Sequence, residues 1–348
     1  MKIGFYNPYF DGFGGGERYV LTLASHWSAR HDVTIFWNDP SVLDESTRRF
    51  QVDLSRVHVE NNIFLEKNFM KKLRETQRYD LLFFLSDGSI PTSFAPRNIL
   101  HMQVPFPKIN APKWKLSRFQ RIVVNSKFTK DHIDPIVGAR ADVIYPPVEL
   151  PVRQRFNKDT VILSVGRFTS YHNAKKQHVL IEAFENAHRA GLWKNWRLVF
   201  VGGLLPSDRS YYDALKTQAK GLPIEFYPNA DHETLVSWYK KASLYWHAAG
   251  FRETDPRLME HFGISTVEAM GWGSVPIVYD GGGQHEIVQN NRSGYLWKNQ
   301  DELREKTSEM IASVQKRNTI ATNAEKRARE FNTDRFLNSF DEILQNGF

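Results

Sequence analysis

The chain has 348 residues, with 46 Lys and Arg, 39 Asp and Glu, and no cysteine. A chain of this length is longer than one average domain, so two cores of roughly 150 to 180 residues each are expected. With 41% hydrophobic residues it can bury such cores and is not a disordered chain. The lack of cysteine excludes disulfides, thiolate zinc sites and a cysteine nucleophile, and it fits a reducing compartment.

The start of the chain and its hydropathy pattern predict neither a signal peptide nor a membrane span. The first apolar run begins at Ile3 and is broken at Asn7-Pro8, too early for a signal peptide. No apolar stretch reaches the roughly 18 residues that a membrane-spanning helix needs. We therefore expect a cytoplasmic protein.

The net charge of +7 is modest, so it indicates solubility rather than a nucleic-acid partner. Its distribution is uneven, because residues 88–130 contain no acidic residue but eight basic ones: Arg97, Lys108, Lys113, Lys115, Arg118, Arg121, Lys127 and Lys130. Two interpretations remain open, a solvated face or a surface that meets an anionic membrane or acidic substrate. On the second, the protein binds peripherally at the inner face of a membrane.

In the first part of the chain, short apolar runs alternate with helical patterns, as in a parallel sheet with crossover helices. The predicted strands are Ile3–Tyr6, Val33–Trp37, Leu81–Leu85, Ile99–Met102, Ile122–Asn125 and Asp142–Tyr145. Helical patterns begin near Gly16, Ser41, Lys67 and Lys127. The alternation stops at Tyr145–Pro151, where three prolines in seven residues predict a linker.

After Asp159 the alternation restarts, with predicted strands at Val161–Val165, Arg197–Val201, Ile224–Tyr227, Leu244–His247, Val275–Val278 and Gly294–Leu296. Helices are predicted near Lys175–Ala190, Ser210–Lys220, His232–Lys241 and Ser265–Met270, followed by three more between Gln300 and Gln345. The pattern predicts an α/β protein with two Rossmann-like, doubly wound domains facing across a cleft. We place them at residues 1–150 and 151–332, with a C-terminal helix, 333–348, that packs back on the first domain.

The first motif is Gly12-Phe13-Gly14-Gly15-Gly16-Glu17, which directly follows the first strand and opens a helix. Glycines let backbone N–H groups approach an anion closely, and the helix N-terminus adds its positive dipole end. A nicotinamide fingerprint needs a third glycine where Glu17 stands, so a dinucleotide dehydrogenase is disfavoured. Gly15 and Gly16 are therefore candidate anion-binding residues, with a purely structural turn as the alternative.

The second motif is Val165-Gly166-Arg167-Phe168, followed by Lys175-Lys176-Gln177, at the end of the first strand of the second domain. Arginine is a permanently charged fork that suits phosphate, and lysine is a flexible point charge. The motif therefore predicts a diphosphate clamp at this strand end.

The third motif has two glutamates, Glu260 and Glu268, separated by seven residues that include Gly263-Ile264-Ser265-Thr266. Ser265 is a candidate N-cap for a helix whose free N–H groups would face an anion, and Glu268 would lie one turn into that helix. Glu260 would lie in the preceding loop. One carboxylate can then meet sugar hydroxyls while the other meets a nucleotide.

These motifs together resemble the retaining glycosyltransferases of family 4, which have the GT-B fold. The resemblance covers both halves of the chain in the family's order, through residues 14–18, 165–176, 260–268, 271–278, 281–288 and 293–296. It implies an acceptor-side first domain and a nucleotide-sugar-binding second domain. The substrates implied are a nucleotide diphosphate sugar and a glycan or lipid-linked acceptor.

The resemblance also implies roles for individual residues. Glu268 would hold the ribose hydroxyls, Glu260 the donor sugar, and the backbone of Gly263, Ile264, Ser265 and Thr266 the sugar or distal phosphate. Arg167 and Lys176 would neutralise the leaving diphosphate, and Gly15 and Gly16 belong to the family's glycine loop. His101, at the end of a first-domain strand, matches the histidine that touches the donor sugar.

One departure from the family pattern concerns the lysines. The segment between Arg167 and Lys176 is longer than the usual family form, so Lys175 is the alternative phosphate ligand. No Asp-x-Asp occurs, and we expect neither a metal nor another cofactor.

The sequence therefore predicts a retaining, metal-independent hexosyltransferase of glycan assembly. Met259–Ile264 resembles the form found in some GDP-mannose enzymes of lipid-linked glycan assembly, so the resemblance slightly favours GDP-mannose over donors of the UDP-glucose type, which use very similar loops. The alternatives are a non-catalytic two-lobed nucleotide- or sugar-binding protein and a sugar-nucleotide epimerase of the same fold.

Overall fold

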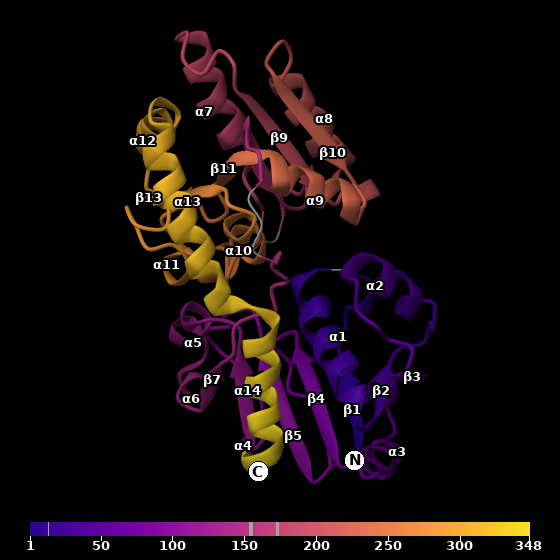
Figure 1. Ribbon diagram of the computed structural model, residues 1–348. Helices are drawn as coiled ribbons and strands as arrows, with labels where there is room; N and C mark the ends of the chain where they lie inside the picture. Colours follow the sequence, from indigo (N-terminus) through magenta and orange to yellow (C-terminus); the bar gives the residue numbers. More distant parts are fainter. Residues whose placement is uncertain (13, 153–155, 172–173) are drawn as a thin grey trace. The chain divides into compact units, whose positions relative to one another are not determined.

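The computed structural model describes residues 1–12, 14–152, 156–171 and 174–348. The chain forms two compact units: unit 1 contains Met1–Pro147 and Thr333–Phe348, and unit 2 contains Val148–Asn332. Each unit is built on one parallel sheet with helices beside it (Figure 1). The predicted α/β class with two parallel sheets is confirmed.

Unit 1 has a seven-stranded sheet in the order β3-β2-β1-β4-β5-β6-β7. Its strands are β1 (Lys2–Tyr6), β2 (Asp32–Phe36), β3 (Val57–Glu60), β4 (Leu81–Ser86), β5 (Arg97–Met102), β6 (Arg121–Val124) and β7 (Ala141–Val143). Every residue of β4 is buried, because helices cover both faces of a doubly wound sheet. Such continuous burial explains why this strand is a continuous apolar run in the sequence.

The helices of unit 1 are α1 (Gly15–Ser28), α2 (Val42–Phe50), α3 (Phe69–Thr76), α4 (Lys113–Ser117), α5 (Lys127–His132), α6 (Pro135–Gly138) and α14 (Thr333–Asn346). The sequence did not predict α4, α6 or strand β3. In β3, at the edge of the sheet, only Val57 is buried, so the strand lacks an apolar run. The helix predicted near Lys67 begins at Phe69, because the Asn68 side chain caps it by accepting a hydrogen bond from the Lys71 amide.

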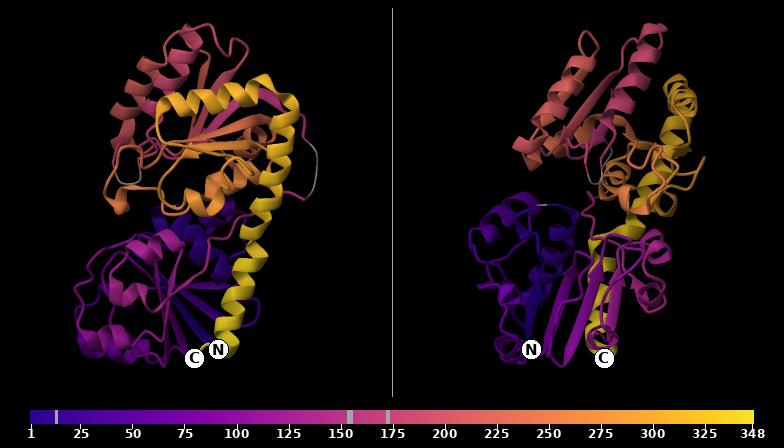
Figure 2. Two further views of the ribbon diagram at one scale, coloured as in Figure 1. Left: turned by 90° about the vertical axis from the view of Figure 1, so that its left-hand side faces the viewer. Right: turned by 180° about the vertical axis from the view of Figure 1, so that it is seen from behind.

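The last helix of the chain, α14, returns to unit 1. Its residues Phe336 and Phe340 lie in the hydrophobic core of unit 1. The Phe336 ring packs edge-on against Tyr19 of α1, with 4.7 Å between ring centroids. The Trp27 indole donates a hydrogen bond to Asp341 (3.1 Å). Figure 2 shows α14 running alongside the sheet of unit 1. Residues 333–348 therefore complete the core of unit 1.

Unit 2 has a six-stranded sheet in the order β10-β9-β8-β11-β12-β13. Its strands are β8 (Asp159–Val165), β9 (Arg197–Gly202), β10 (Ile224–Pro228), β11 (Ala242–His247), β12 (Val275–Tyr279) and β13 (Tyr295–Trp297). Its helices are α7 (Gln177–Arg189), α8 (Arg209–Gln218), α9 (His232–Lys241), α10 (Ile264–Gly271), α11 (Gln284–Ile287), α12 (Gln300–Ala312) and α13 (Val314–Ala328).

Both sheets contain a switch point that positions loops for ligands. In unit 1, β1 lies between β2 and β4, and in unit 2, β8 lies between β9 and β11. Loops diverge at such a point, which leaves a crevice at the carboxyl ends of the strands. The glycine motif follows β1, Arg167 follows β8, and His247 ends β11. Among the described residues, no helix combines the length and apolar character needed to cross a bilayer.

Candidate active site

The N-terminal end of α10 is shaped by Gly263. Its φ of +117° lies in a region that only glycine adopts readily, and the helix begins at the next residue, Ile264. Ser265 is therefore inside the helix, and the prediction that it caps α10 is wrong. Its hydroxyl instead accepts a hydrogen bond from Tyr245 of β11 (2.7 Å). The first N–H groups of the helix have no intrahelical acceptor and carry positive partial charge, so this end of α10 suits an anion.

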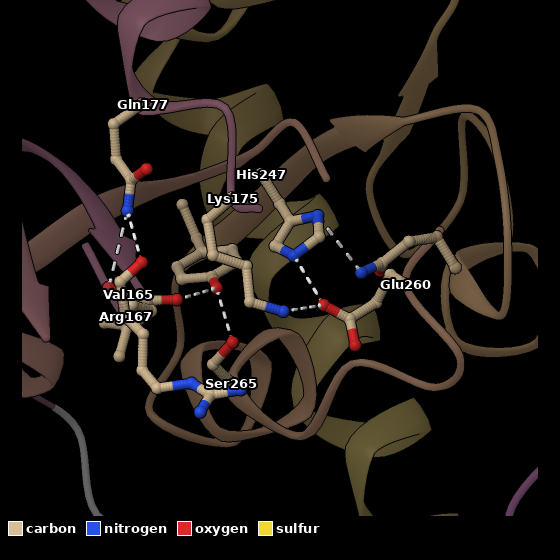
Figure 3. Close-up of polar contacts among 10 residues, drawn as sticks. Val165, Arg167, Lys175, Gln177, His247, Glu260 and Ser265 are labelled. Atoms are coloured by element: carbon tan, nitrogen blue, oxygen red, sulfur yellow. Dashed lines mark hydrogen bonds and ion pairs between the residues drawn. The ribbon is translucent and has the colours of Figure 1, made fainter. Parts of the chain in front are cut away.

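Glu260 stands in the loop before α10 and meets two side chains from other elements. Lys175 Nζ and His247 Nε2 both donate to Glu260 Oε2, at 2.6 Å and 2.9 Å (Figure 3). The Glu260 side chain is only 15% exposed. Burial alone raises the pKa of this carboxyl, but the charge of Lys175 and the two hydrogen bonds outweigh burial and hold the pKa well below its usual range. Glu260 is therefore a fixed carboxylate at neutral pH.

His247 is a site residue that the motif analysis missed. Its side chain is 1% exposed, and burial lowers its pKa, so the ring is neutral at pH 7. The Nε2–H group donates to Glu260, while Nδ1 accepts a hydrogen bond from Gln284 at 3.4 Å. The signal in the sequence was its place at the carboxyl end of a buried strand, where ligand sites of α/β sheets form.

The two adjacent lysines reach different carboxylates. Lys176 adopts a left-handed backbone conformation, with φ of 54°, at the start of α7. Lys175 pairs with Glu260, whereas Lys176 Nζ lies 2.5 Å from Glu253 Oε1. Residues 172–173 of the preceding loop lie outside the described part of the chain. The structure therefore brings Lys175, the alternative ligand of the sequence analysis, to Glu260.

Arg167 follows β8 and has an exposed side chain. Its loop is held by Gln177 of α7, whose amide donates to the Arg167 carbonyl (2.9 Å). In Figure 3 the guanidinium of Arg167 extends toward the side of α10 where Ser265 lies. Arg167 therefore contributes a permanent positive charge to the loop at the carboxyl end of β8.

Glu268 lies one turn into α10, as predicted from its spacing. Tyr239 of α9 donates a hydrogen bond to Glu268 Oε2 (2.8 Å). Lys158 in turn donates to the backbone carbonyls of Tyr239 (3.0 Å) and Trp272 (2.5 Å), which lie near the C-terminal ends of α9 and α10. The two helices that hold Glu268 in place are therefore tied together by one lysine.

In unit 1 the glycine motif is closed by Glu17. This buried carboxylate accepts hydrogen bonds from the Gly14 amide (2.6 Å) and the Asn7 side chain (3.0 Å). Gly15 and Gly16 are the first residues of α1. Phe13, inside the motif, lies outside the described residues. Glu17 thus stabilises the loop from the position where a dinucleotide fingerprint has glycine.

His101 ends up deep in unit 1. The ring is fully buried and stacks on Tyr19, with 3.9 Å between ring centroids. Both nitrogens have partners, because Nδ1 donates to the Val123 carbonyl (3.1 Å) and Nε2 faces the Gln103 amide (3.0 Å). Burial lowers the pKa of His101 to about 3. Its contact with a donor sugar stays a prediction.

The predicted site residues therefore fall into two groups. Unit 2 holds Arg167, Lys176, Glu260, Glu268 and the Gly263–Thr266 segment, all on loops or helix ends beside the carboxyl ends of its strands. Unit 1 holds Gly15, Gly16 and His101, at the carboxyl ends of β1 and β5. Each group occupies the place that a doubly wound sheet provides for ligands.

Two doubly wound units with such groups at their strand ends have the architecture of the GT-B fold of glycosyltransferases. Family profiles agree: "Glycosyl transferases group 1" matches residues 149–327, and "Glycosyltransferase Family 4" matches residues 13–151. The chain belongs to the glycosyl transferases group 1 family.

Curated relatives carry the name GDP-Man:Man(3)GlcNAc(2)-PP-Dol alpha-1,2-mannosyltransferase. The protein from Dictyostelium discoideum is 29% identical over 240 residues, which cover 63% of this chain and 44% of the relative. The mouse protein is 25% identical over 242 residues, covering 63% and 47%. The chain thus spans about half the length of these relatives.

Solved structures show the same fold. Anabaena HepE in complex with UDP and glucose superposes with a TM-score of 0.70 at 20% identity, and the match covers 99% of both chains. Sucrose-phosphate synthase from Thermosynechococcus elongatus has a TM-score of 0.71 at 17% identity, covering 100% of this chain and 99% of that one.

Proposed function

We propose that this glycosyltransferase is a retaining, metal-independent enzyme that transfers mannose from GDP-mannose to a lipid-linked or other glycan acceptor. The observation that carries the proposal is the fixed Glu260 carboxylate, held by Lys175 and His247 next to the N-terminal end of α10. A buried carboxylate kept charged beside a positive helix end suits a ligand with both hydroxyls and phosphates.

The proposed donor contacts follow from this arrangement. Glu268 accepts hydrogen bonds from the ribose hydroxyls, and Glu260 accepts them from the sugar. The amides at the start of α10 and the side chain of Arg167 stabilise the diphosphate, together with Lys175 or Lys176. These positive groups stabilise the charge that grows on the diphosphate as it leaves, which is where catalysis needs them.

The proposed reaction keeps the configuration at the anomeric carbon. The bond from that carbon to the diphosphate oxygen breaks, and its electron pair leaves with GDP. The acceptor hydroxyl forms the new bond from the same face, and its proton passes to a phosphate oxygen of the leaving group. Glu260 is held by two donors on one oxygen, which supports a role in orienting the sugar rather than in forming a covalent intermediate.

Two observations support GDP-mannose as the donor. The curated relatives are named as GDP-mannose enzymes. In addition, the segment Met259–Ile264 resembles the corresponding segment of some GDP-mannose enzymes. UDP-glucose is the second candidate, because HepE, a structural neighbour, was solved with UDP-glucose. For the acceptor we propose a lipid-linked glycan, in line with the PP-Dol acceptor in the names of the relatives. We further propose that the reaction takes place at the cytoplasmic face of a membrane.

A thermal-shift panel of GDP, UDP, ADP and their sugars tests the donor. A ligand at 100 times its dissociation constant adds about 2.7 kcal/mol to the free energy of unfolding. GDP and GDP-mannose should give the largest shifts, and a larger shift with UDP-glucose would overturn the assignment. Turnover that is lost in EDTA and restored by manganese would contradict metal independence.

The alternatives are separated by the products. Incubation with labelled donor and acceptor should release GDP and label the acceptor. An unreleased, unchanged donor would indicate a binding protein, and a sugar of inverted configuration without acceptor labelling would indicate an epimerase.

A further inference from the structure

Four large apolar side chains of unit 1 are exposed around α3 and α4. They are Leu65 (67% exposed), Phe69 (51%), Met70 (65%) and Trp114 (49%). Leu65 ends a short 3-10 turn just before α3, and Phe69 and Met70 are the first two residues of that helix. We call these four residues the α3–α4 patch. Large apolar residues that gather on a surface usually mark a binding region.

Contacts join the two helices into one surface. The ring of Phe94 packs edge-on against the ring of Phe69 of α3, with 5.5 Å between centroids. The guanidinium of Arg118, which follows α4, lies 5.8 Å from the centroid of the Phe94 ring. The pKa of Lys72 is lowered, first by its partial burial and second by repulsion from Lys115, so the two lysines lie near each other. Figure 1 shows α3 and α4 at the end of unit 1 that also holds both chain termini.

The charge around the patch is strongly positive. Residues 61–76 contain four basic and two acidic residues, and residues 108–121 contain five basic and none acidic. Four lysines lie within the two helices, Lys71, Lys72, Lys113 and Lys115, and of these Lys71 pairs with Glu66. Lysines attract anionic groups, and exposed aromatic and aliphatic side chains bind apolar material. Together they suit a partner with anionic groups at its surface and an apolar layer beneath them.

Two basic residues of the 88–130 stretch are bound within unit 1 and are therefore less available to a partner surface. Arg118 donates to the Ala95 carbonyl (3.0 Å), and Arg121 donates to the Gly347 carbonyl (2.6 Å). These two arginines stabilise the fold of unit 1, so they contribute less to an outer surface. The α3 segment, outside that stretch, adds lysines and the apolar side chains that the charge pattern alone did not indicate.

We propose that the α3–α4 patch docks unit 1 on an anionic lipid bilayer. Tryptophan and phenylalanine settle at the boundary between headgroups and acyl chains, while lysines attract anionic headgroups. A soluble partner bound through charge alone would pair with the lysines but would leave Leu65, Phe69 and Met70 exposed to water. The bilayer satisfies both.

The inference goes beyond the proposed function and does not depend on it. Helix α3 leads into the amino end of β4, and α4 into the amino end of β6, whereas the glycine motif follows the carboxyl end of β1. Within unit 1 the patch is therefore separate from the predicted donor residues. Vesicle binding can be measured without any nucleotide sugar, so the two proposals can fail independently.

Co-sedimentation with vesicles tests the proposal. The protein should sediment with vesicles rich in phosphatidylglycerol at low salt, release at high salt, and sediment weakly with phosphatidylcholine alone. The double variant Lys72→Gln/Lys115→Gln should bind about 25-fold more weakly, since each basic residue near an anionic surface changes the partition about fivefold. The variant Phe69→Ser/Met70→Ser should bind vesicles on the order of tenfold more weakly, and it should be released from them at a lower salt concentration than the wild type.

Matched variants in unit 2 serve as controls. Leu205→Ser removes an apolar side chain that is 56% exposed, and Lys216→Gln/Lys220→Gln removes two exposed lysines. Both controls should bind vesicles like the wild type, and all variants should keep the wild-type circular dichroism. The proposal is overturned if the wild type ignores anionic vesicles at low salt, or if the controls lose as much binding as the patch variants. It is also overturned if the patch variants change the oligomeric state without vesicles, because a second copy then covers the patch.

Discussion

Lys175 Nζ lies 2.6 Å from Glu260 Oε2, inside unit 2, where both side chains are less than one-fifth exposed. The two residues are far apart in sequence and come from the loop before α7 and the loop before α10. A partly buried pair of this kind fixes the carboxylate and keeps it charged. Removal of one partner leaves a charge that is expensive to keep in a poorly solvated place.

The first prediction concerns this pair. Lys175→Met should lower kcat about 100-fold or more, because Glu260 then loses its charged donor and the orientation that the sugar requires. The pKa of the Glu260 carboxyl should rise toward its ordinary range, so the acid limb of the pH–rate profile should move upward. Steady-state kinetics of donor turnover between acid and neutral pH measure both effects.

Lys176→Met is the matched control, since Lys176 pairs with Glu253 and not with Glu260. It should leave the pH profile in place. If instead Lys176→Met is the damaging change and Lys175→Met is nearly silent, the sequence-based choice of Lys176 was right and the role of Lys175 is structural.

The second prediction concerns nucleotide affinity. Glu268→Ala should weaken donor binding by about 1.5 to 3 kcal/mol, the value of hydrogen bonds to a charged group. Tyr239→Phe removes only the hydroxyl that holds Glu268 and should cost about 0.5 to 1.5 kcal/mol. Calorimetric titration with the nucleotide measures both values, and unchanged affinity in Glu268→Ala would rule out the ribose assignment.

Local pattern was enough to predict most of the fold. A strand such as β4 is buried along its whole length, so it is a run of apolar residues that can be recognised without knowledge of its neighbours. Strand β3 was not predicted from the sequence, because its position at the sheet edge leaves only Val57 buried. The spacing of Glu260 and Glu268 was informative for a similar reason, since one helix and its preceding loop carry both.

The partners of these glutamates could not be predicted, because they come from other elements. His247 is the last residue of β11, Tyr239 lies in α9, and Lys175 precedes α7. Only folding of the sheet brings these strand and helix ends together. Ser265 was misassigned as a cap for a local reason: Gly263 adopts the positive φ, so the helix starts earlier.

The third prediction concerns His247. His247→Leu should lower kcat about 10- to 100-fold with a smaller change in KM, because it removes one of the two donors that orient Glu260. His247→Gln keeps a donor of similar reach and should recover part of the loss. A purely structural role would instead reduce stability in both variants and leave the kcat of the folded fraction unchanged, so active-site titration must accompany the kinetics.

The last prediction concerns His101 and acid stability. Its pKa is about 3 in the folded protein because of burial, whereas the ordinary value in an unfolded chain is about 6.5. Between these two values the unfolded state binds a proton that the folded state does not. The stability of unit 1 should therefore be fully present above about pH 6.5 and decrease as the pH falls, by about 2 kcal/mol between pH 7 and pH 5 from this residue alone.

Hydrogen exchange of the amides in β4 and β5, corrected for intrinsic rates, measures this free energy at both pH values. His101→Leu lacks the titrating group, so its stability should change by about 2 kcal/mol less over the same interval than that of the wild type, whatever its absolute stability. Equal pH dependence in His101→Leu and the wild type would show that His101 is not the buried neutral ring described above, and that water reaches it in solution.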